Sequence, residues 1–309
     1  AALFAVAQAA WQINLAMALV GGGGAPVLVS GYYIFARVFS ARMFGTLAGL
    51  MIGLGSLGNI ASSLPLAFAV EAFGWRGTLW ALAALTFVLA AGILLLVRDP
   101  ERLGLTVKGS VLELLQMPAV WLILPIVAVN NLPIAGLRGL WVAPYLEQVF
   151  GLDATAIGKV TLAMGLAMVL GNLAYGPLDR LFGTRKWLIF AGNALMMFAL
   201  VALCAWPART LGFSTSMLAA VGFFGASFPM VMGHGRALFP PHLVGRGVTL
   251  LNFFGIGTIG VMQVATGQLY SRMQGTQAEE IIFPVIFAIY AILIAVALVV
   301  YLFAQDRTD

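Results

Sequence analysis

Long runs of hydrophobic residues, separated by short groups of charged, glycine and proline residues, set the pattern of this chain. Most runs have the roughly 20 to 25 residues that a helix needs to cross the hydrocarbon core of a bilayer. The runs are continuous and lack the alternation of a β-barrel strand, so we predict helices. The pattern predicts an N-terminal stub at 1–10 and nine full spans, near 11–36, 44–70, 76–97, 118–147, 156–178, 186–206, 211–234, 246–270 and 281–304.

The composition indicates the same class of protein. The 309 residues are 62% hydrophobic and 9% charged, whereas an ordinary soluble domain carries about 25% charged residues. This excludes a cytosolic enzyme, a nucleic-acid-binding protein and a disordered protein. The single cysteine, Cys204, excludes an internal disulfide, and the two histidines, His234 and His242, lack the spacing of a metal site. We therefore predict an all-α polytopic membrane protein without a metal or cofactor.

The distribution of basic residues predicts how the chain is oriented. Nine spans divide the loops and termini into two sets, of which one holds eleven Lys and Arg residues and the other four. Cytoplasmic loops carry such an excess, so we predict a cytoplasmic C-terminus. The most polar of these loops, 98–117, is predicted to be a linker whose second half forms a short amphipathic helix. The predicted organisation is a first part at 1–97, the linker at 98–117 and a second part at 118–309.

Arg138 lies well inside the predicted span 118–147, nine residues from its nearer end. Counted from Leu122, it lies about 24 Å into a hydrocarbon core about 30 Å thick. An arginine there costs about 2.5–3.5 kcal/mol on insertion scales and usually faces a cavity or a partner. A guanidinium in that position predicts an anionic substrate, either a carboxylate or a phosphate. The alternative is that Arg138 extends to the membrane–water interface.

The span that carries Arg138 also contains Pro125, Asn130, Asn131 and Pro133. Proline removes a backbone donor and kinks a helix, and the two amides can satisfy the carbonyls that a kink leaves free. A broken helix at mid-depth often marks the binding site of a transporter. Asn130 and Asn131 are therefore candidate substrate residues, with a kink that only packs as the alternative.

Three segments resemble motifs of the major facilitator superfamily. Gly-Gly-Gly-Gly-Ala-Pro at 21–26 resembles the glycine-rich fourth helix of that family, and Phe-Gly-Trp-Arg-Gly at 73–77 resembles the link between its fifth and sixth helices. The segment 176–186 resembles the loop between helices eight and nine. The resemblance covers the whole chain. It implies that 1–10 end helix three, that 1–97 are the remainder of an N-terminal bundle, and that 118–309 hold helices seven to twelve and a short cytoplasmic tail.

The resemblance also implies a transport mechanism and site residues. Helix seven lines the central cavity in the family, which adds Trp141 and Tyr145 to the candidates, and Tyr32 lies toward the end of helix four. For Trp141 and Tyr145 the alternative is an aromatic belt at the membrane surface. The loop cluster is the implied gate, which latches two moving bundles; its members are Asp179, Arg180, Arg185 and Lys186. For the cluster, the alternative is a set of solvated charges that fixes topology.

These observations together predict a secondary active transporter that moves a small solute, with an organic anion as the expected class, by alternating access. The alternative is a non-transporting, MFS-like membrane sensor or assembly factor. The predicted spans hold no Asp or Glu at mid-depth, so we do not expect an enzyme. The expected partners are a small-molecule substrate and the lipid bilayer, with no nucleic acid. The expected location is the cell inner membrane, and the expected state is a monomer.

Overall fold

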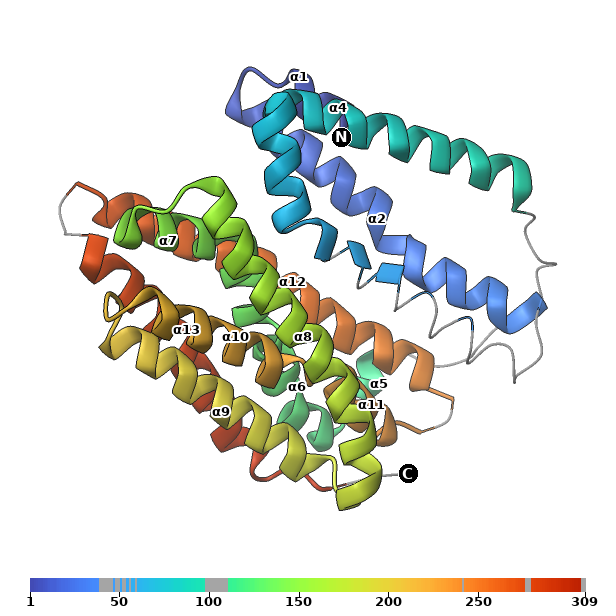
Figure 1. The fold of residues 1–309 in the computed structure, drawn as a ribbon. Coiled ribbons are helices and arrows are strands. Elements are labelled where there is room, and N and C mark those ends of the chain that lie inside the picture. Colours follow the sequence, from blue (N-terminus) through green and yellow to red (C-terminus); the bar gives the residue numbers. More distant parts are fainter. Residues whose placement is uncertain are drawn as a thin grey trace. The chain divides into compact units, whose positions relative to one another are not determined.

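A computed structural model of the chain describes residues 1–38, 47, 51, 54–55, 57–58, 60–97, 111–240, 242–275 and 279–306. Within these residues the regular elements are all helices (Figure 1). The chain divides into two compact units, Ala1–Leu105 and Thr106–Asp309. Each unit is described by itself. The first thirteen residues of the predicted linker lie outside the described residues, and its last part contains the short helix α5 (Val111–Leu115).

The first unit contains α1 (Ala2–Val6), α2 (Ala10–Val38) and α4 (Leu64–Leu96), and α1 packs on both longer helices. A guanidinium N–H of Arg76 donates to the carbonyl of Ala7 at 3.3 Å. The sequence predicted a short connection at 71–75 between two spans, and α4 leaves helical geometry at Gly74 in this region, where two helical segments meet at a kink (Figure 1). Gly74 has a φ of +70°, which a residue without a Cβ adopts readily. The kink at Gly74 thus lies where the connection was predicted.

The second unit is a bundle in which the long helices pack side by side (Figure 1). α8 packs on α10, α10 on α9, α9 on α13, and α6 on both α13 and α12. Hydrophobic side chains from all these helices form one core. Besides α5, the elements are α6 (Pro118–Asn130), the π-helix η1 (Pro133–Trp141), α7 (Val142–Phe150), α8 (Ala154–Phe182), α9 (Lys186–Ala205), α10 (Leu211–Gly225), α11 (Phe228–Ala237), α12 (Val244–Met273) and α13 (Glu279–Tyr301).

Seven segments among the described residues are long and apolar enough to cross a membrane. One is α4, one is the continuous stretch Pro118–Phe150, and another is Leu211–Ala237, which includes α10 and α11. Much of the expected span at 44–70 lies outside the described residues, so the number of nine stays a prediction. The fold class is confirmed as far as these seven segments reach: the chain is helical and multi-pass.

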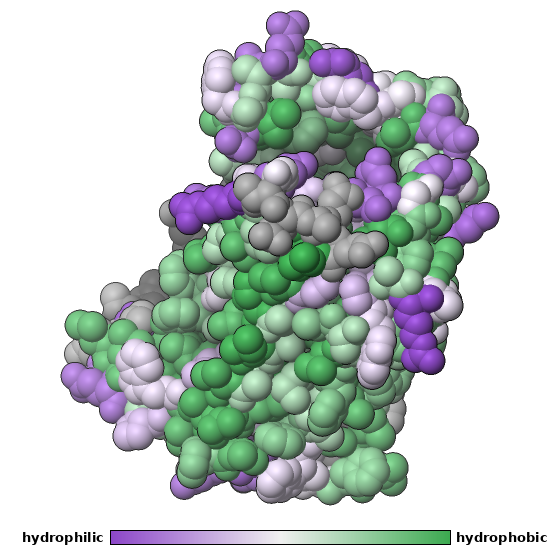
Figure 2. Space-filling view, turned by 90° about the vertical axis from the view of Figure 1, so that its left-hand side faces the viewer, coloured by the Kyte–Doolittle hydropathy of each residue, from purple (hydrophilic) through white to green (hydrophobic). Residues whose placement is uncertain are grey.

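The outside of the helices is apolar, as a bilayer requires. Leu94, Leu95 and Leu96 on α4 are each more than 80% exposed, and on α12 the side chains of Phe253 and Val264 are exposed as well. Hydrophobic residues form a large, continuous part of the face shown in Figure 2. A soluble protein rarely exposes so much contiguous apolar surface. Such an apolar surface fits a multi-pass membrane protein.

Glycines allow α8 and α10 to approach closely. A Cβ on Gly222 of α10 would lie 2.7 Å from the carbonyl oxygen of Met164 on α8. A Cβ on Gly171 of α8 would overlap the carbonyl oxygen of Phe223 and lie 2.9 Å from the Cβ of Ala226. Small residues at helix contacts have this effect in membrane proteins generally. The contact between α8 and α10 thus depends on Gly171 and Gly222.

We expect Gly171→Ala to destabilise the full-length protein by about 1–3 kcal/mol, because backbone atoms must move to admit the new methyl group. Thermal unfolding in detergent, followed by tryptophan fluorescence, measures this as a lower Tm. Gly212→Ala on α10 is the matched control, because a Cβ there meets no atom within 4 Å. The control should leave Tm unchanged or raise it. Equal Tm values for both variants would contradict the close contact.

Candidate functional site

Two long segments of the second unit are broken along their length. The stretch Pro118–Phe150 changes from α6 to the π-helix η1 around Asn131, and Leu211–Ala237 breaks between α10 and α11. Pro133 and Pro229 stand in the first turns of the helices that follow the breaks, where a missing N–H costs no helical hydrogen bond. A change from α-helical to π-helical geometry stands at Pro133, and a kink there stays a prediction. The π-helical form and the second break were not predicted.

A buried polar cluster joins the two breaks. Asn130, at the end of α6, donates from Nδ2 to Oδ1 of Asn193 on α9 at 2.9 Å and to Oγ of Ser227 at 2.8 Å. All three side chains are fully buried. The hydroxyl of Tyr175 on α8 donates to the carbonyl of Phe224, near the end of α10, at 2.7 Å. One backbone carbonyl near the second break, that of Phe224, thus accepts a hydrogen bond from a neighbouring helix, and the side chains of Asn130 and Ser227 join the two breaks.

Arg138 lies on η1 and is half-buried. Its guanidinium rests against α8, with Nη2 3.4 Å from the position that a Cβ on Gly165 would occupy. The following residue, Gly139, faces α12, where the Nε2 atom of Gln263 lies 3.4 Å from the position of a Cβ on Gly139. Since Gly165 has no side chain, α8 leaves room for the guanidinium itself. This geometry holds a cation inside a membrane segment, and a guanidinium can bind a carboxylate or phosphate with two hydrogen bonds.

Trp141 and Tyr145 lie in the packed core of the second unit. Trp141 is 3% exposed and donates from Nε1 to Oγ1 of Thr266 at 3.0 Å. Tyr145 is fully buried; its hydroxyl lies 2.8 Å from Oγ of Ser214 and donates to the carbonyl of Pro207. Both side chains thus bind neighbouring helices or the loop after α9. Their contact with a substrate stays a prediction.

The remaining predicted substrate residues lie in different units. Asn131 in the second unit is half-buried, and its carbonyl accepts the N–H of Ala135 at 3.0 Å. Tyr32 belongs to α2 of the first unit, and its side chain lies outside the described residues. The structure therefore brings Asn130, Asn131 and Arg138 to one segment of the second unit.

The end of the chain binds the start of α9. The carboxylate of Asp306 accepts hydrogen bonds from the backbone N–H of Arg185 at 3.2 Å, from that of Lys186 at 3.0 Å and from the hydroxyl of Thr184. Lys186 also donates from Nζ to the carbonyl of Leu302 at 2.7 Å. A carboxylate at the N-terminus of a helix is favourable because unpaired N–H groups and the helix dipole converge there. We call these interactions the C-terminal contact.

A buried histidine extends the C-terminal contact to α11. His234 is fully buried; Nδ1 lies 2.6 Å from the hydroxyl of Tyr301 and Nε2 lies 2.8 Å from the carbonyl of Gln305. Of the four predicted gating residues, the side chains of Asp179 and Arg180 lie outside the described residues. The other two take part in the C-terminal contact, and a gating role for the four stays a prediction.

The C-terminal contact shifts the pKa of Asp306. Partial burial raises this pKa, but the hydrogen bonds from Thr184, Lys186 and Arg185, together with the electrostatic interaction with His234, lower it more. The pKa therefore lies below the ordinary value for an aspartate.

The site contains residues that the sequence did not single out. Ser227 precedes Phe228 and Pro229, a pattern typical of a helix start, and this signal was available in the sequence. Nothing in the sequence around Gly165 or Asp306 indicated a role, because their contacts are with residues far away in the sequence and form only when the helices pack.

The comparisons with known proteins give one match. The family model described as Major Facilitator Superfamily matches residues 132–309. This is more than half of the chain, which therefore belongs to that superfamily and is a membrane transport protein of the general kind found there. A search of curated proteins found no match.

We expect Asn193→Ala to lower the stability of the full-length protein by about 1 kcal/mol, the usual scale for such interhelical hydrogen bonds. The substitution removes the Oδ1 atom that accepts a hydrogen bond from Nδ2 of Asn130. Thermal unfolding in detergent measures the loss of stability as a lower Tm. Asn172→Ala is the control, because Asn172 is exposed and donates to Met168 of its own helix. Similar Tm losses in both variants would show that the cluster adds no stability.

We expect Asp306→Asn to lower Tm at pH 7. Because the folded pKa of Asp306 is depressed, the stabilisation is complete above the unfolded pKa of about 4 and disappears as the pH falls through the folded value. The Tm difference between wild type and variant should therefore shrink as the pH falls below about 4. Unfolding scans from pH 7 down to pH 3 test this, and a difference that stays constant over this range contradicts it.

Proposed function

We propose that this chain, as a member of the major facilitator superfamily, belongs to a secondary active transporter that moves a small organic anion by alternating access. Transport in general follows from the family. The single observation that supports an anionic substrate is the position of Arg138, whose guanidinium rests beside Gly165 inside a membrane segment. A cation is costly there, and an anion that binds it offsets that cost.

The helix breaks support the same region as the substrate site. Arg138 lies on the π-helix that begins directly after the first break, and π-helical turns occur frequently at functional sites. Asn130 and Asn131 stand at the break itself. In transporters, interrupted helices near the middle of the bilayer commonly form the site. We propose that Arg138 binds the negative charge of the substrate and that Asn131 lies beside the path by which the substrate reaches Arg138.

The proposal includes the orientation of the chain in the membrane and a gate. The excess of basic residues in one set of loops supports a cytoplasmic C-terminus, and a bacterial inner membrane is the proposed location. The loop with Asp179, Arg180, Arg185 and Lys186 is proposed to latch the moving parts. The C-terminal contact supports this, because it fixes the last two of these residues at the start of α9.

The first experiment is a thermal-shift screen of the full-length protein in detergent, with small carboxylates, phosphates, sugars and cations in parallel. A ligand that binds only the folded state raises stability by about 2.7 kcal/mol at one hundred times its dissociation constant. An anion should stabilise the wild type and not Arg138→Ala. A sugar or cation as the sole stabilising ligand would contradict the proposed substrate class.

We expect Arg138→Lys and Arg138→Gln to reduce uptake of that anion into proteoliposomes by about 10- to 100-fold, the effect of losing a charge-assisted hydrogen bond. The glutamine variant should lose more than the lysine variant. Arg209→Gln is the control, because Arg209 lies in the loop before α10 and its guanidinium stacks 5.3 Å from the ring centroid of Phe213. Unchanged uptake in both Arg138 variants would remove the binding role, and binding without any uptake would favour the sensor.

A further inference from the structure

The hydroxyl of Tyr290 on α13 packs directly against the backbone of the π-helix η1. A Cβ added to Gly136 of η1 would lie 2.6 Å from the Oη atom of Tyr290 and 3.2 Å from its Cζ atom. Both residues are buried in the second unit. Glycine permits such a close approach because it has no side chain. At this position η1 therefore admits only a glycine while the tyrosine keeps its place.

The Tyr290 hydroxyl gains no hydrogen bond from this position. Its polar neighbours are Trp141 and Thr266. Trp141 donates its Nε1–H to Thr266, and Thr266 donates its own hydroxyl hydrogen to the carbonyl of Met262. Among the described residues the Tyr290 hydroxyl is left without a hydrogen-bond partner. Since a phenylalanine of the same shape would avoid the cost of burying that hydroxyl, what the hydroxyl contributes in this conformation is the space that it fills.

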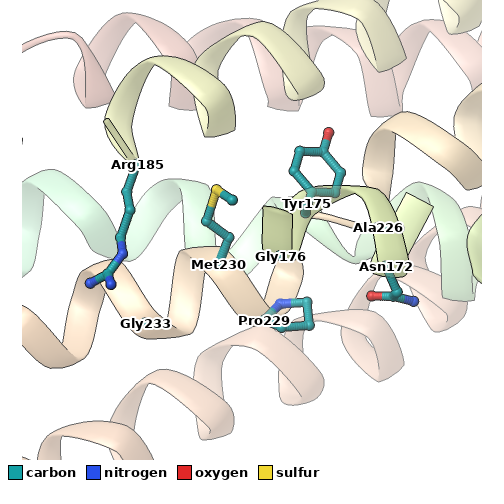
Figure 3. A pocket seen from close by; sticks show the side chains of 8 residues that line it. All are labelled: Asn172, Tyr175, Gly176, Arg185, Ala226, Pro229, Met230 and Gly233. Carbon is teal, nitrogen blue, oxygen red and sulfur yellow. The ribbon is translucent and has the colours of Figure 1, made fainter. Parts of the chain in front are cut away.

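Tyr175 of α8 gives the comparison within the same unit. Its hydroxyl also lies over a glycine, because a Cβ on Gly192 of α9 would overlap it. Figure 3 shows the Tyr175 side chain with its hydroxyl pointing away from Pro229, and this hydroxyl donates to the carbonyl of Phe224 at 2.7 Å. Tyr175 thus makes a hydrogen bond where Tyr290 makes none, so removing the two hydroxyls should affect stability differently.

The contact at Gly136 fixes which residue of η1 faces α13. One residue turns an α-helix by about 100°, so a shift of register by one position would bring Ala135 or Leu137 opposite Tyr290. Both carry a Cβ, which would collide with the hydroxyl at the distance found for Gly136. A π-helix forms i→i+5 bonds and an α-helix i→i+4 bonds, so a return of η1 to α-helical geometry includes such a shift. The hydroxyl of Tyr290 therefore opposes that return.

Arg138 follows Gly136 by two residues in the same short helix. A contact that holds the register at Gly136 therefore also sets the direction of the Arg138 side chain. In this register the Nη2 atom of Arg138 lies 3.4 Å from the position that a Cβ on Gly165 of α8 would occupy. The end of η1 is held separately, because Trp141 donates to a residue of α12 at 3.0 Å. The middle of η1 is thus the part that Tyr290 controls.

We propose that Tyr290 is a positioning residue: its hydroxyl, packed on Gly136, keeps η1 in the π-helical register in which Arg138 faces α8. Tyr290 acts through its shape and not through a hydrogen bond or a charge. That this direction of Arg138 serves substrate binding rests on the proposed function, whereas the direction itself does not.

The first test measures Tm of the full-length protein in detergent. Tyr290→Phe should leave Tm unchanged or raise it, whereas Tyr175→Phe should lower it because a hydrogen bond is lost. Gly136→Ala should lower Tm by at least about 3 °C, because its methyl group overlaps the hydroxyl, and adding Tyr290→Phe should restore most of this loss. Gly139→Ala is the matched control, since a Cβ there meets only the end of the Gln263 side chain, at 3.4 Å. Equal losses for the two glycine variants would contradict the contact.

The second test reads the direction of Arg138 and needs no substrate. In the Cys204→Ser background, Gly165→Cys places a thiol where the guanidinium of Arg138 covers it. Such a thiol reacts with iodoacetamide, a small neutral reagent, only when its cover moves away. Adding Arg138→Ala removes the cover and sets the upper limit of the rate, which mass spectrometry follows at position 165. Adding Tyr290→Phe should speed the reaction about tenfold, because the cover then opens more often.

The outcomes separate positioning from a structural role. Gly136→Ala together with Tyr290→Phe should return the rate towards that of the parent, because the methyl group takes the space of the lost hydroxyl. Gly212→Cys on α10, an open glycine position, is the control thiol, and its rate should not respond to Tyr290→Phe. An unchanged rate at position 165 in Tyr290→Phe would overturn the proposal, and so would an unchanged rate in Arg138→Ala.

The proposed function stands or fails separately. If Tyr290→Phe uncovers position 165 while Arg138→Gln leaves anion uptake unchanged, Tyr290 positions Arg138 but the binding role of Arg138 is lost. If Arg138→Gln abolishes uptake while Tyr290→Phe changes no rate, the binding role is kept and the positioning role of Tyr290 is overturned.

Discussion

Backbone N–H and C=O groups inside a bilayer need hydrogen-bond partners from the protein, and this requirement constrains how the helices of the second unit can be interrupted. An unbroken helix pairs these groups internally, and a break inside the bilayer persists only where other groups replace the lost pairs. Here Asn130 binds Ser227 between the two breaks, and Tyr175 binds the carbonyl of Phe224. Because the breaks share one buried cluster, one of them cannot shift alone without leaving a polar group unpaired, which is costly in an apolar interior. The two broken segments are therefore coupled.

The local pattern of hydrophobic, proline and charged residues predicted much of this fold but less of the site. Hydrophobic runs located the long helices, Pro133 located a break, and Arg138 stood out because a charge inside a span is expensive. The pattern could not show that Ser227 would bind Asn130 or that Asp306 would bind the start of α9, since these pairs are 97 and at least 120 residues apart. It did locate the break within α4, because Gly74 can adopt the positive φ at which one helical segment ends and the next begins.

The glycines of α8 divide their roles by direction. Gly171 faces α10 and allows the two helices to meet. Gly165 lies on another side, where the guanidinium of Arg138 rests against it. An added side chain at Gly171 would push two helices apart, whereas at Gly176 it would enter open space. One helix thus packs against α10 on one face and admits the guanidinium of Arg138 on another.

Exposure separates the groups suited to bind a ligand from those that hold the bundle together. The amides of Asn130 and Asn193 are fully buried and bonded within the protein, which suits a structural joint. Arg138 is half-buried, and its guanidinium rests against Gly165 of α8. A half-buried guanidinium can meet a ligand without breaking the hydrogen bonds that join the two interrupted segments, whereas the buried amides cannot. On the proposed assignment, Arg138 therefore contacts the substrate and the asparagine cluster holds the bundle together around it.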